Sequence, residues 1–371
     1  MSDNKIDEIN EQMRYVKELG ELKKKEFELK KHSVESKYEE VQEARRQIEA
    51  LSRLDITRQT PEYIQNLANK STEYLQNSRK RANFIVNIED FNKFIPFFPK
   101  NLIVIGAHSG EGKSTCCANI AYSQLIQGKR PIIITNEEAA EDVYNRVAAL
   151  FMGVRYGNHD TITDEQIESF NHYIKILPER MTVIDDAYGS MNSESIENTT
   201  TSIEGLEFIL SKLLKKQAEG FTYDSVIIDY FQTFHESKAV PSMDSVKVLT
   251  KVAAKLDQFK NHYNAPIVVF SQLKSSSSEN SDISVKDRIE HCKNIYNRAT
   301  SFIELKAIRS ESASQWIIHK SRWSDYPNKV FVTGWDKGKY VPMDEDFKKK
   351  ILERKNIEMQ KKLDNLRNNK E

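Results

Sequence analysis

A glycine-rich segment at residues 106–115, with the sequence GAHSGEGKST, constrains the fold of this chain more than any other stretch. It follows the apolar run Leu102–Ile105, which predicts a buried strand, and it precedes residues 116–125, which predict a helix. A glycine-rich turn that joins a strand to a helix and ends in Gly-Lys-Ser is typical of a phosphate-binding loop. Its backbone N–H groups point into one concavity, and the helix N-terminus adds positive potential. The predicted phosphate-binding residues are Ser109, Gly110, Glu111, Gly112, Lys113, Ser114 and Thr115.

The loop also assigns roles to two of its side chains. In loops of this type the lysine reaches the β- and γ-phosphates and the next hydroxyl binds Mg²⁺, so we expect these roles for Lys113 and Ser114. The first position of the G-x-x-x-x-G-K-[ST] pattern is Ala107 here, and Gly106 lies one residue too early. The alternative is a glycine-rich turn that binds nothing, but the strand before it and the helix after it favour a phosphate site.

The composition is that of a soluble protein with long exposed helices, with 39% hydrophobic and 30% charged residues among 371. Lysine plus arginine and aspartate plus glutamate balance at 55 each, so a nucleic-acid contact would need a local basic surface. No run approaches the length of a membrane span, and no apolar signal segment follows the N-terminus. Two of the three cysteines are adjacent, which argues against a disulfide framework. We therefore expect a cytoplasmic protein.

From residue 102 to about residue 341, apolar strands and helices alternate, which predicts a mostly parallel sheet with helices on both faces. The expected strands are 102–106, 131–136, 181–185, 224–229 and 265–271. The expected helices lie near 113–127, 139–151, 163–175, 203–219 and 244–263. After residue 271, the short strands 301–307, 315–321 and 329–333 predict an antiparallel extension of the sheet.

Charged helical segments flank this α/β region on both sides. Residues 1–83 are predicted to form a helical arm, because partial heptads recur at 6–16 and 38–51. The arm is either a coiled coil for assembly or partner binding, or a solvated helix packed on its own domain, and the two short runs leave both open. Residues 346–371 predict a charged helical tail. The predicted domains are therefore 1–83, 84–345 and 346–371.

Two of the predicted strands end in carboxylates that suit Mg²⁺. Asp229 ends the apolar strand 224–229, and Asp185-Asp186 follows the strand that begins at Met181. Ligands of parallel sheets bind at the carboxyl ends of the strands, so both positions qualify. Position in the sheet alone leaves the choice between them open.

The strand next to the loop in sequence, 131–136, is followed by Glu137 and Glu138. A glutamate one strand away from the phosphates can hold and polarise the attacking water as a base. The alternative is that both acids stabilise the N-terminus of the following helix. Gln272, at the end of the strand 265–271, is the candidate γ-phosphate sensor, because a polar amide there can contact the γ-phosphate and move the serine-rich loop that follows. The alternative is that this loop is an ordinary surface loop.

The candidate cations are Lys320 and Arg322, which alternate along a predicted strand and therefore lie on one face. An arginine presented to the nucleotide of a neighbouring subunit stabilises negative charge in the transition state of phosphoryl transfer. The alternative is a solvated strand edge, which is the commoner role of a Lys-x-Arg pattern.

Taken together, these strings resemble the RecA-like motor domain of the DnaB family of ring helicases, superfamily 4, over about residues 84–342. They occur in the order of the family: AHSGEGKST from 107, TNEEAAE from 135, DYFQ from 229, SQL from 271 and KSR from 320. The phosphate-binding loop of that family also begins with alanine, so Ala107 supports the resemblance. The family string Asp-Tyr-Leu-Gln favours Asp229 over its rival as the metal-binding carboxylate.

The resemblance implies an α/β fold of the RecA-like P-loop NTPase type, which hydrolyses ATP with Mg²⁺. It implies translocation on single-stranded DNA and duplex unwinding in DNA replication by a homo-oligomer, expected to be a hexameric ring, with a primase or helicase loader as partner. Carried over residue by residue, the catalytic set is Glu137, Gln272, Lys320 and Arg322, and the metal ligands are Ser114 and Asp229.

The chain also departs from the family. Residues 323–327 replace the asparagine and glycines that follow Lys-x-Arg, and the loop after Leu273 carries serines instead of the usual arginine. The resemblance places single-stranded DNA binding in the loops after Asp229 and after Leu273, where basic density is modest, with Lys238, Lys247 and Lys274. The globular N-terminal domain of the family is not recognisable in residues 1–83, so we expect a phage-type or divergent member, in the host cytoplasm if it is phage-encoded. The rival hypothesis is a RecA-fold ATPase that acts as a switch or assembly module without unwinding.

Overall fold

The protein is represented by a computed structural model. The structure describes residues 65, 69, 84–86, 89–95, 97–157, 163–185, 201–235, 245–274, 284–289, 292–322, 329–351 and 353. The chain divides into two compact units, Met1–Arg79 and Lys80–Glu371, and nearly all the described residues belong to the second. Most of the predicted arm, 1–83, and most of the predicted tail, 346–371, lie outside the described residues, so the three predicted domains stay a prediction.

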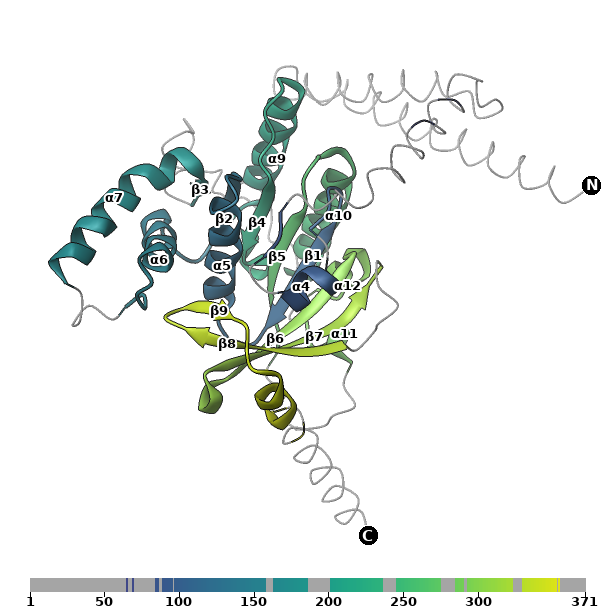
Figure 1. Ribbon diagram of the computed structural model, residues 1–371. Coiled ribbons are helices and arrows are strands. Elements are labelled where there is room, and N and C mark those ends of the chain that lie inside the picture. The colour runs from purple at the N-terminus through teal and green to yellow at the C-terminus, as the bar shows by residue number, and fades with distance from the viewer. Residues whose placement is uncertain are drawn as a thin grey trace, which may run out of the picture. The chain divides into compact units, whose positions relative to one another are not determined.

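A nine-stranded sheet forms the centre of the second unit, with the strand order β3-β2-β4-β5-β1-β6-β7-β8-β9 (Figure 1). The first six strands in this order are parallel: β3 (Thr182–Ile184), β2 (Pro131–Thr135), β4 (Ser225–Asp229), β5 (Ile267–Gln272), β1 (Leu102–Ala107) and β6 (Ser301–Ile308). The last three run antiparallel: β7 (Ala313–Ser321), β8 (Lys329–Asp336) and β9 (Lys339–Val341). The five strands expected in the parallel region are confirmed.

The antiparallel extension differs from the prediction at its first strand. β6 pairs with β1 in parallel, from Ile103 opposite Ser301 to Ala107 opposite Leu305, and only its other edge pairs antiparallel with β7. β6 therefore belongs to both parts of the sheet. The strand β9, three residues long, was not predicted because its pattern is too short to be distinguished from a turn.

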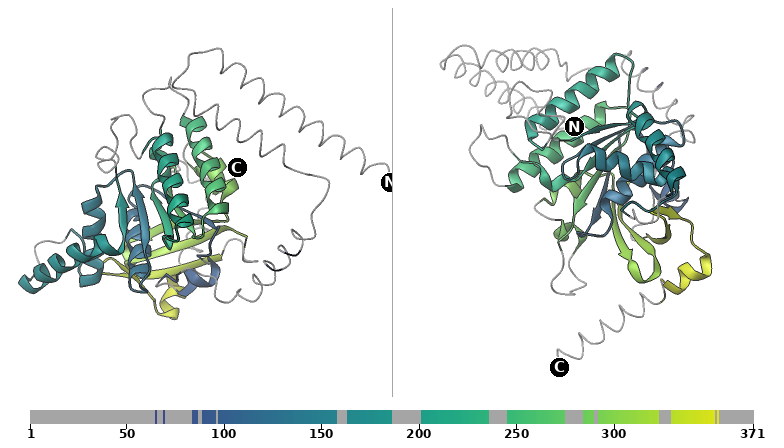
Figure 2. Two further views of the ribbon diagram at one scale, coloured as in Figure 1. Left: turned by 90° about the horizontal axis from the view of Figure 1, so that it is seen from above. Right: turned by 90° about the vertical axis from the view of Figure 1, so that its left-hand side faces the viewer.

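Helices cover both faces of the sheet, as the two views of Figure 2 show. The long helices are α5 (Lys113–Leu125), α6 (Ala140–Met152), α7 (Asp164–Arg180), α9 (Ile203–Ala218) and α10 (Ser245–His262). The short ones are α4 (Glu89–Phe94), α11 (Val285–Arg288) and α12 (Asn294–Arg298). All five long helices were expected from the sequence, and α7 extends five residues beyond its expected end at residue 175.

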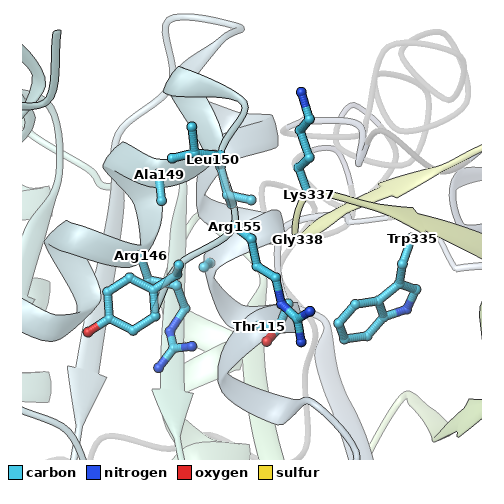
Figure 3. A pocket seen from close by; sticks show the side chains of 11 residues that line it. Thr115, Arg146, Ala149, Leu150, Arg155, Trp335, Lys337 and Gly338 are labelled. Carbon is cyan, nitrogen blue, oxygen red and sulfur yellow. The ribbon is translucent and has the colours of Figure 1, made fainter. Parts of the chain in front are cut away.

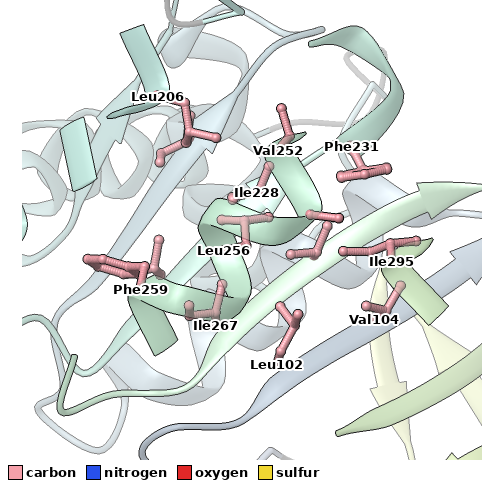
Figure 4. Close-up of a cluster of buried hydrophobic side chains, with 14 of the residues drawn as sticks. Leu102, Val104, Leu206, Ile228, Phe231, Val252, Leu256, Phe259, Ile267 and Ile295 are labelled. Atoms are coloured by element: carbon pink, nitrogen blue, oxygen red, sulfur yellow. The ribbon is translucent and has the colours of Figure 1, made fainter. Parts of the chain in front are cut away.

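Alternation along the strands divides the core into two layers. Ile103 and Ile105 belong to the layer that includes α5 and α6, whereas Leu102 and Val104 belong to the layer under α9, α10 and α12 (Figure 4). Successive side chains of a strand point to opposite faces, so a strand buried on both faces reads as a continuous apolar run. Among the described helices, none combines the length and the apolar character that crossing a membrane requires.

The antiparallel end of the sheet is held against the rest by aromatic rings and one amide. Phe91 on α4 packs edge-on against Trp316 of β7, with ring centroids 5.1 Å apart. Asn119 of α5 donates to the carbonyl oxygen of Gly338 at 2.8 Å and accepts the N–H of Tyr340 at 3.1 Å. The turn between β8 and β9 is therefore fixed to the helix that follows the phosphate loop.

Candidate functional site

The phosphate loop joins β1, which ends at Ala107, to α5, which begins at Lys113. Gly110 and Gly112 have φ angles of +76° and +92°, a region that L-residues rarely adopt, so both positions require glycine. A Cβ atom at Gly112 would also lie 3.2 Å from the indole of Trp335. The loop thus has the backbone that its motif predicts.

The odd first position of the motif has a packing explanation. Gly106 lies within β1, and a Cβ atom there would come within 2.8 Å of the ring of Phe302 on β6. Glycine is therefore needed at 106 to let the β6 side chain approach the strand, not to bind phosphate. Ala107 is fully buried and has no positive φ, so alanine fits without strain.

Lys113 is folded back over its own loop and is 8% exposed. Its Nζ lies 3.4 Å from the carbonyl oxygen of His108 and 5.6 Å from the centroid of the Tyr230 ring. The next residue, Ser114, forms a side-chain hydrogen bond with Asp229 at the end of β4. The two motifs are therefore in direct contact.

Asp229 is the buried carboxylate of the site, with 5% of its surface exposed. The pKa of Asp229 is raised to about 7: burial is the largest cause and the nearby charges of Glu138 and Glu137 add to the rise, while the Ser114 hydrogen bond and the charge of Lys113 oppose it. Its Oδ1 atom is buried without a hydrogen-bond partner. A buried carboxylate oxygen with no partner beside a serine hydroxyl fits a divalent cation such as Mg²⁺. The described residues contain no group of three or more His, Cys, Asp or Glu side chains that could hold a metal ion.

The rival carboxylate has a structural partner. Asp185 follows β3, and its Oδ2 accepts the backbone N–H of Ala140 at 2.8 Å, at the first residue of α6. It therefore satisfies one of the unpaired donors at a helix N-terminus. Asp186 lies outside the described residues.

The two glutamates after β2 differ in their contacts. Glu138 pairs with Arg146 of α6 at 2.6 Å, and its N–H donates to the Thr135 hydroxyl at 3.1 Å. Glu137 is exposed, and its carboxylate has no partner among the residues that the structure describes. Neither is the N-cap residue of α6, which is Ala139, but both come just before it, so the alternative that their charges stabilise this helix N-terminus stays open. Of the two, Glu137 has the carboxylate that is free to act on a water molecule.

Gln272, the last residue of β5, is tied to the motif after β4 by an amide. Its backbone N–H donates to Oε1 of Gln232 at 2.9 Å, and Nε2 of Gln232 donates to its carbonyl oxygen at 3.0 Å. The same Nε2 lies 2.9 Å from the Ser271 hydroxyl. In the sequence, Gln232 was noted only as a member of the DYFQ motif that begins at Asp229. The structure shows that Gln232 links the end of β4 to the end of β5.

Lys320 and Arg322 lie at the opposite end of the strands from the loop. The N–H of Arg322 donates to Thr300 O, and the N–H of Thr300 donates to Leu102 O at the start of β1. The loop follows the far end of that six-residue strand, so roughly 20 Å separate the two places. Lys320 donates to the carbonyl oxygens of Tyr296 and Asn297 at 2.8 and 2.9 Å. Burial, and then the charge of Arg322, lowers the pKa of Lys320 to about 8.

A cavity of about 180 Å³ adjoins the loop and was not predicted. Thr115, Arg155 and Trp335 line it, from α5, from the segment after α6 and from β8. Figure 3 shows the Arg155 guanidinium pointing toward the space between Thr115 and the indole of Trp335. An indole and a guanidinium both stack on flat aromatic ligands, which makes the cavity suitable for a nucleotide base. No local pattern reveals it, because its lining comes from three distant segments.

The raised pKa of Asp229 leads to a stability prediction. Between about pH 4 and pH 7 the folded protein retains a proton that the unfolded chain releases, so this group's contribution to stability is lost as the pH rises through that window. Asp229→Asn removes this titration. We therefore expect the free energy of unfolding of the variant minus that of wild type to be larger at pH 8 than at pH 5, by an amount on the order of a few kcal/mol. Thermal unfolding without Mg²⁺ or nucleotide measures this. The exposed Asp336→Asn is the control, and an equal difference at both pH values would contradict the prediction.

The chain is similar to known proteins in its sequence family, in a curated relative and in its fold. The sequence model of one family, described as DnaB-like helicase C-terminal domain, matches residues 85–287, more than half of the chain. A curated relative, "Probable replicative DNA helicase" of Trieres chinensis, is 27% identical over 181 residues, which are 48% of this chain and 36% of that protein. The chain thus spans about a third of the length of this relative. Lys320 and Arg322 lie beyond the residues that the family model matches.

Two solved structures resemble this fold, each with a TM-score of 0.60. One is described as an ATPase domain, at 13% identity, covering 75% of this chain and 98% of that one. The other is described as a DnaB-like replicative helicase and its interactions with primase, at 12% identity, covering 90% of this chain and 77% of that one. At these identities the likeness supports the RecA-like fold.

Proposed function

The chain belongs to the family of the DnaB-like helicase C-terminal domain, and from this premise we propose that it is a replicative DNA helicase powered by ATP hydrolysis. One observation carries the proposal most directly. At a single edge of the sheet, the Ser114–Asp229 pair with its unpartnered Oδ1 lies beside the free carboxylate of Glu137. These are the groups that hydrolysis of a nucleoside triphosphate requires.

The loop from Ser109 to Thr115 would hold the phosphates through its N–H groups, with Lys113 neutralising the β- and γ-phosphates. The base would occupy the cavity between Arg155 and Trp335. The Ser114 hydroxyl and Asp229 would hold Mg²⁺, which when bound neutralises charge on the phosphate oxygens. Because burial raises the pKa of Asp229, a bound cation would add to the charge of Lys113 in stabilising the ionised carboxylate.

Glu137 would orient the attacking water and accept its proton, since its carboxylate is the one near Asp229 without a partner of its own. Gln272 would contact the γ-phosphate. A shift of Gln272 on that contact would move the hydrogen-bonded Gln232 amide and, with it, the segment that follows β4. Both segments that follow, 236–244 and 275–283, lie outside the described residues. By resemblance to the family, we assign the single-stranded DNA contacts to them.

The position of Arg322 supports a ring assembly. Its side chain cannot bridge the roughly 20 Å to the loop of its own chain, so it would serve the nucleotide of a neighbouring subunit. A hexameric homo-oligomer is the assembly that the family implies. The primase interaction named for one structural neighbour, or a helicase loader, is the partner that we extend to this chain.

The test is whether DNA and hydrolysis are coupled. We expect single-stranded DNA to stimulate Mg²⁺-dependent ATP hydrolysis several-fold, and we expect the DNA affinity to fall steeply as salt is raised, since phosphate contacts would dominate. Hydrolysis rates with and without an oligonucleotide, over a series of salt concentrations, measure both. Hydrolysis that is indifferent to DNA would instead support a RecA-fold switch or assembly module.

A further inference from the structure

A buried carboxylate on β6 lies at the centre of a charged cluster that has no role in the nucleotide site. Glu304 is 1% exposed, and both of its oxygens bind Arg288, each at 2.7 Å. The His319 ring nitrogen Nε2 lies 2.7 Å from Oε2, and Lys306 lies 3.2 Å from Oε1. Although burial alone would raise the pKa of Glu304, the hydrogen bonds from His319 and Arg288 hold it well below its usual range.

Arg288, the partner of this carboxylate, lies where the residues before and after the segment 275–283 meet. Arg288 is the last residue of α11, and its carbonyl oxygen accepts the N–H of Lys274 at 2.7 Å. Leu273 and Ile289, both buried, form an antiparallel bridge beside it. The two ends of the segment are therefore joined at one point, and the side chain of Arg288 ties that point to Glu304.

The same point is attached to the phosphate loop. The N–H of Leu273 donates to Ala107 O at 3.0 Å, and its carbonyl oxygen lies 3.1 Å from Nδ1 of His108. Glu304 itself is paired in register with Gly106 on β1. Ala107 and His108, at the start of the phosphate loop, thus contact Leu273 before the segment 275–283, while Glu304 binds Arg288 after it.

The chemistry of the pair indicates a need for fixed geometry more than for stability. Replacing a buried ion pair by apolar residues of similar size often costs no stability, so such a pair is weak evidence for a stabilising role. The planar fork of an arginine on a carboxylate instead fixes both distance and orientation. A shift of Arg288 would move the Lys274 hydrogen bond and, with it, the contacts of Leu273 to the loop.

We propose that Glu304 is a positioning residue that, through Arg288, fixes the two ends of the segment 275–283 against the phosphate loop and so couples DNA binding to ATP hydrolysis. The coupling rests on the proposed helicase function, whereas the fixing of the segment ends does not. Glu304 makes no contact with the nucleotide in this account, and it acts only through Arg288.

The test compares Glu304→Gln with Lys306→Ala. The glutamine keeps the shape of the side chain but loses its charge, whereas the control removes only the half-exposed partner of the same carboxylate. In Glu304→Gln we expect the stimulation of ATP hydrolysis by single-stranded DNA to fall at least fivefold, with the DNA-free kcat within twofold of wild type. Lys306→Ala is expected to change neither rate by more than twofold. An equal loss of both rates in Glu304→Gln, or unchanged stimulation, would overturn the proposal.

A second readout does not depend on activity. Hydrogen exchange of the peptides covering 270–274 and 284–290 is expected to be faster in Glu304→Gln and in Arg288→Lys, which keeps the charge but loses the fork, and unchanged in Lys306→Ala. Unchanged exchange in both pair variants would refute the fixing of the segment ends. If wild-type hydrolysis is not stimulated by DNA, the proposed function fails, and the exchange result alone then decides whether Glu304 fixes the segment.

Discussion

Glu137→Gln is expected to abolish turnover while leaving nucleotide binding intact. The amide cannot accept the proton of the attacking water, and loss of a general base typically costs about 10²–10⁴-fold in rate. We expect binding to be preserved because the proposed phosphate contacts come from the loop Ser109–Thr115, which includes Lys113, and no contact of Glu137 with this loop is found among the described residues. Steady-state ATP hydrolysis and equilibrium titration with a fluorescent nucleotide measure the two properties separately.

The neighbouring glutamate supplies the matched control. Glu138 holds Arg146 at 2.6 Å, so Glu138→Gln weakens an ion pair of the pocket wall and is expected to reduce turnover less than tenfold. Normal turnover in Glu137→Gln, or a larger loss in Glu138→Gln than in Glu137→Gln, would show that the base has been assigned to the wrong residue.

Arg322→Ala is expected to reduce turnover by about 10³-fold or more without affecting DNA-independent oligomer formation, because an arginine finger stabilises the charge of the transition state. Under the proposed assignment the loss falls on the site of the adjacent subunit, because Arg322 lies at the far end of the strands from the loop of its own chain. Hydrolysis rates of the purified variant, with assembly followed by light scattering, measure this effect.

Mixing inactive variants tests the shared site directly. When Arg322→Ala subunits are mixed with Lys113→Ala subunits, some interfaces combine an intact phosphate loop with an intact arginine, so part of the activity should return. Mixing Lys113→Ala with Glu137→Gln is the control, because both lesions affect the same chain's site and no interface is intact. Mixed oligomers that stay inactive in the first experiment, or regain activity in the second, would contradict the assignment in trans.

The sequence predicts the parallel part of the sheet well because each strand there is buried on both faces. Leu102–Ile105 and Val226–Ile228 are continuous apolar runs, and each is followed by a motif at its carboxyl end. The partner of a strand, by contrast, depends on contacts between distant segments. The sequence therefore predicts β6 as part of the antiparallel extension. In the structure β6 pairs in parallel with β1, and Gly106 leaves room there for the ring of Phe302.

The sequence could propose candidate residues for the site because phosphate chemistry requires certain residue types at fixed spacing. Position alone left Asp229 and Asp185 equivalent, and the structure distinguishes them by their partners, a serine hydroxyl for one and a helix N–H for the other. Trp335 and Glu304 carry no such spacing signal. Their roles arise only when β8 and β6 are folded against segments far away in the chain.

The most direct test of the central account is strand separation on a forked DNA duplex with single-stranded tails. We expect the wild-type protein to separate the strands with ATP and Mg²⁺, at a rate that follows hydrolysis, and Glu137→Gln to bind the fork without opening it. DNA-independent hydrolysis with no strand separation by the wild-type protein would contradict the account and leave a RecA-fold switch in its place.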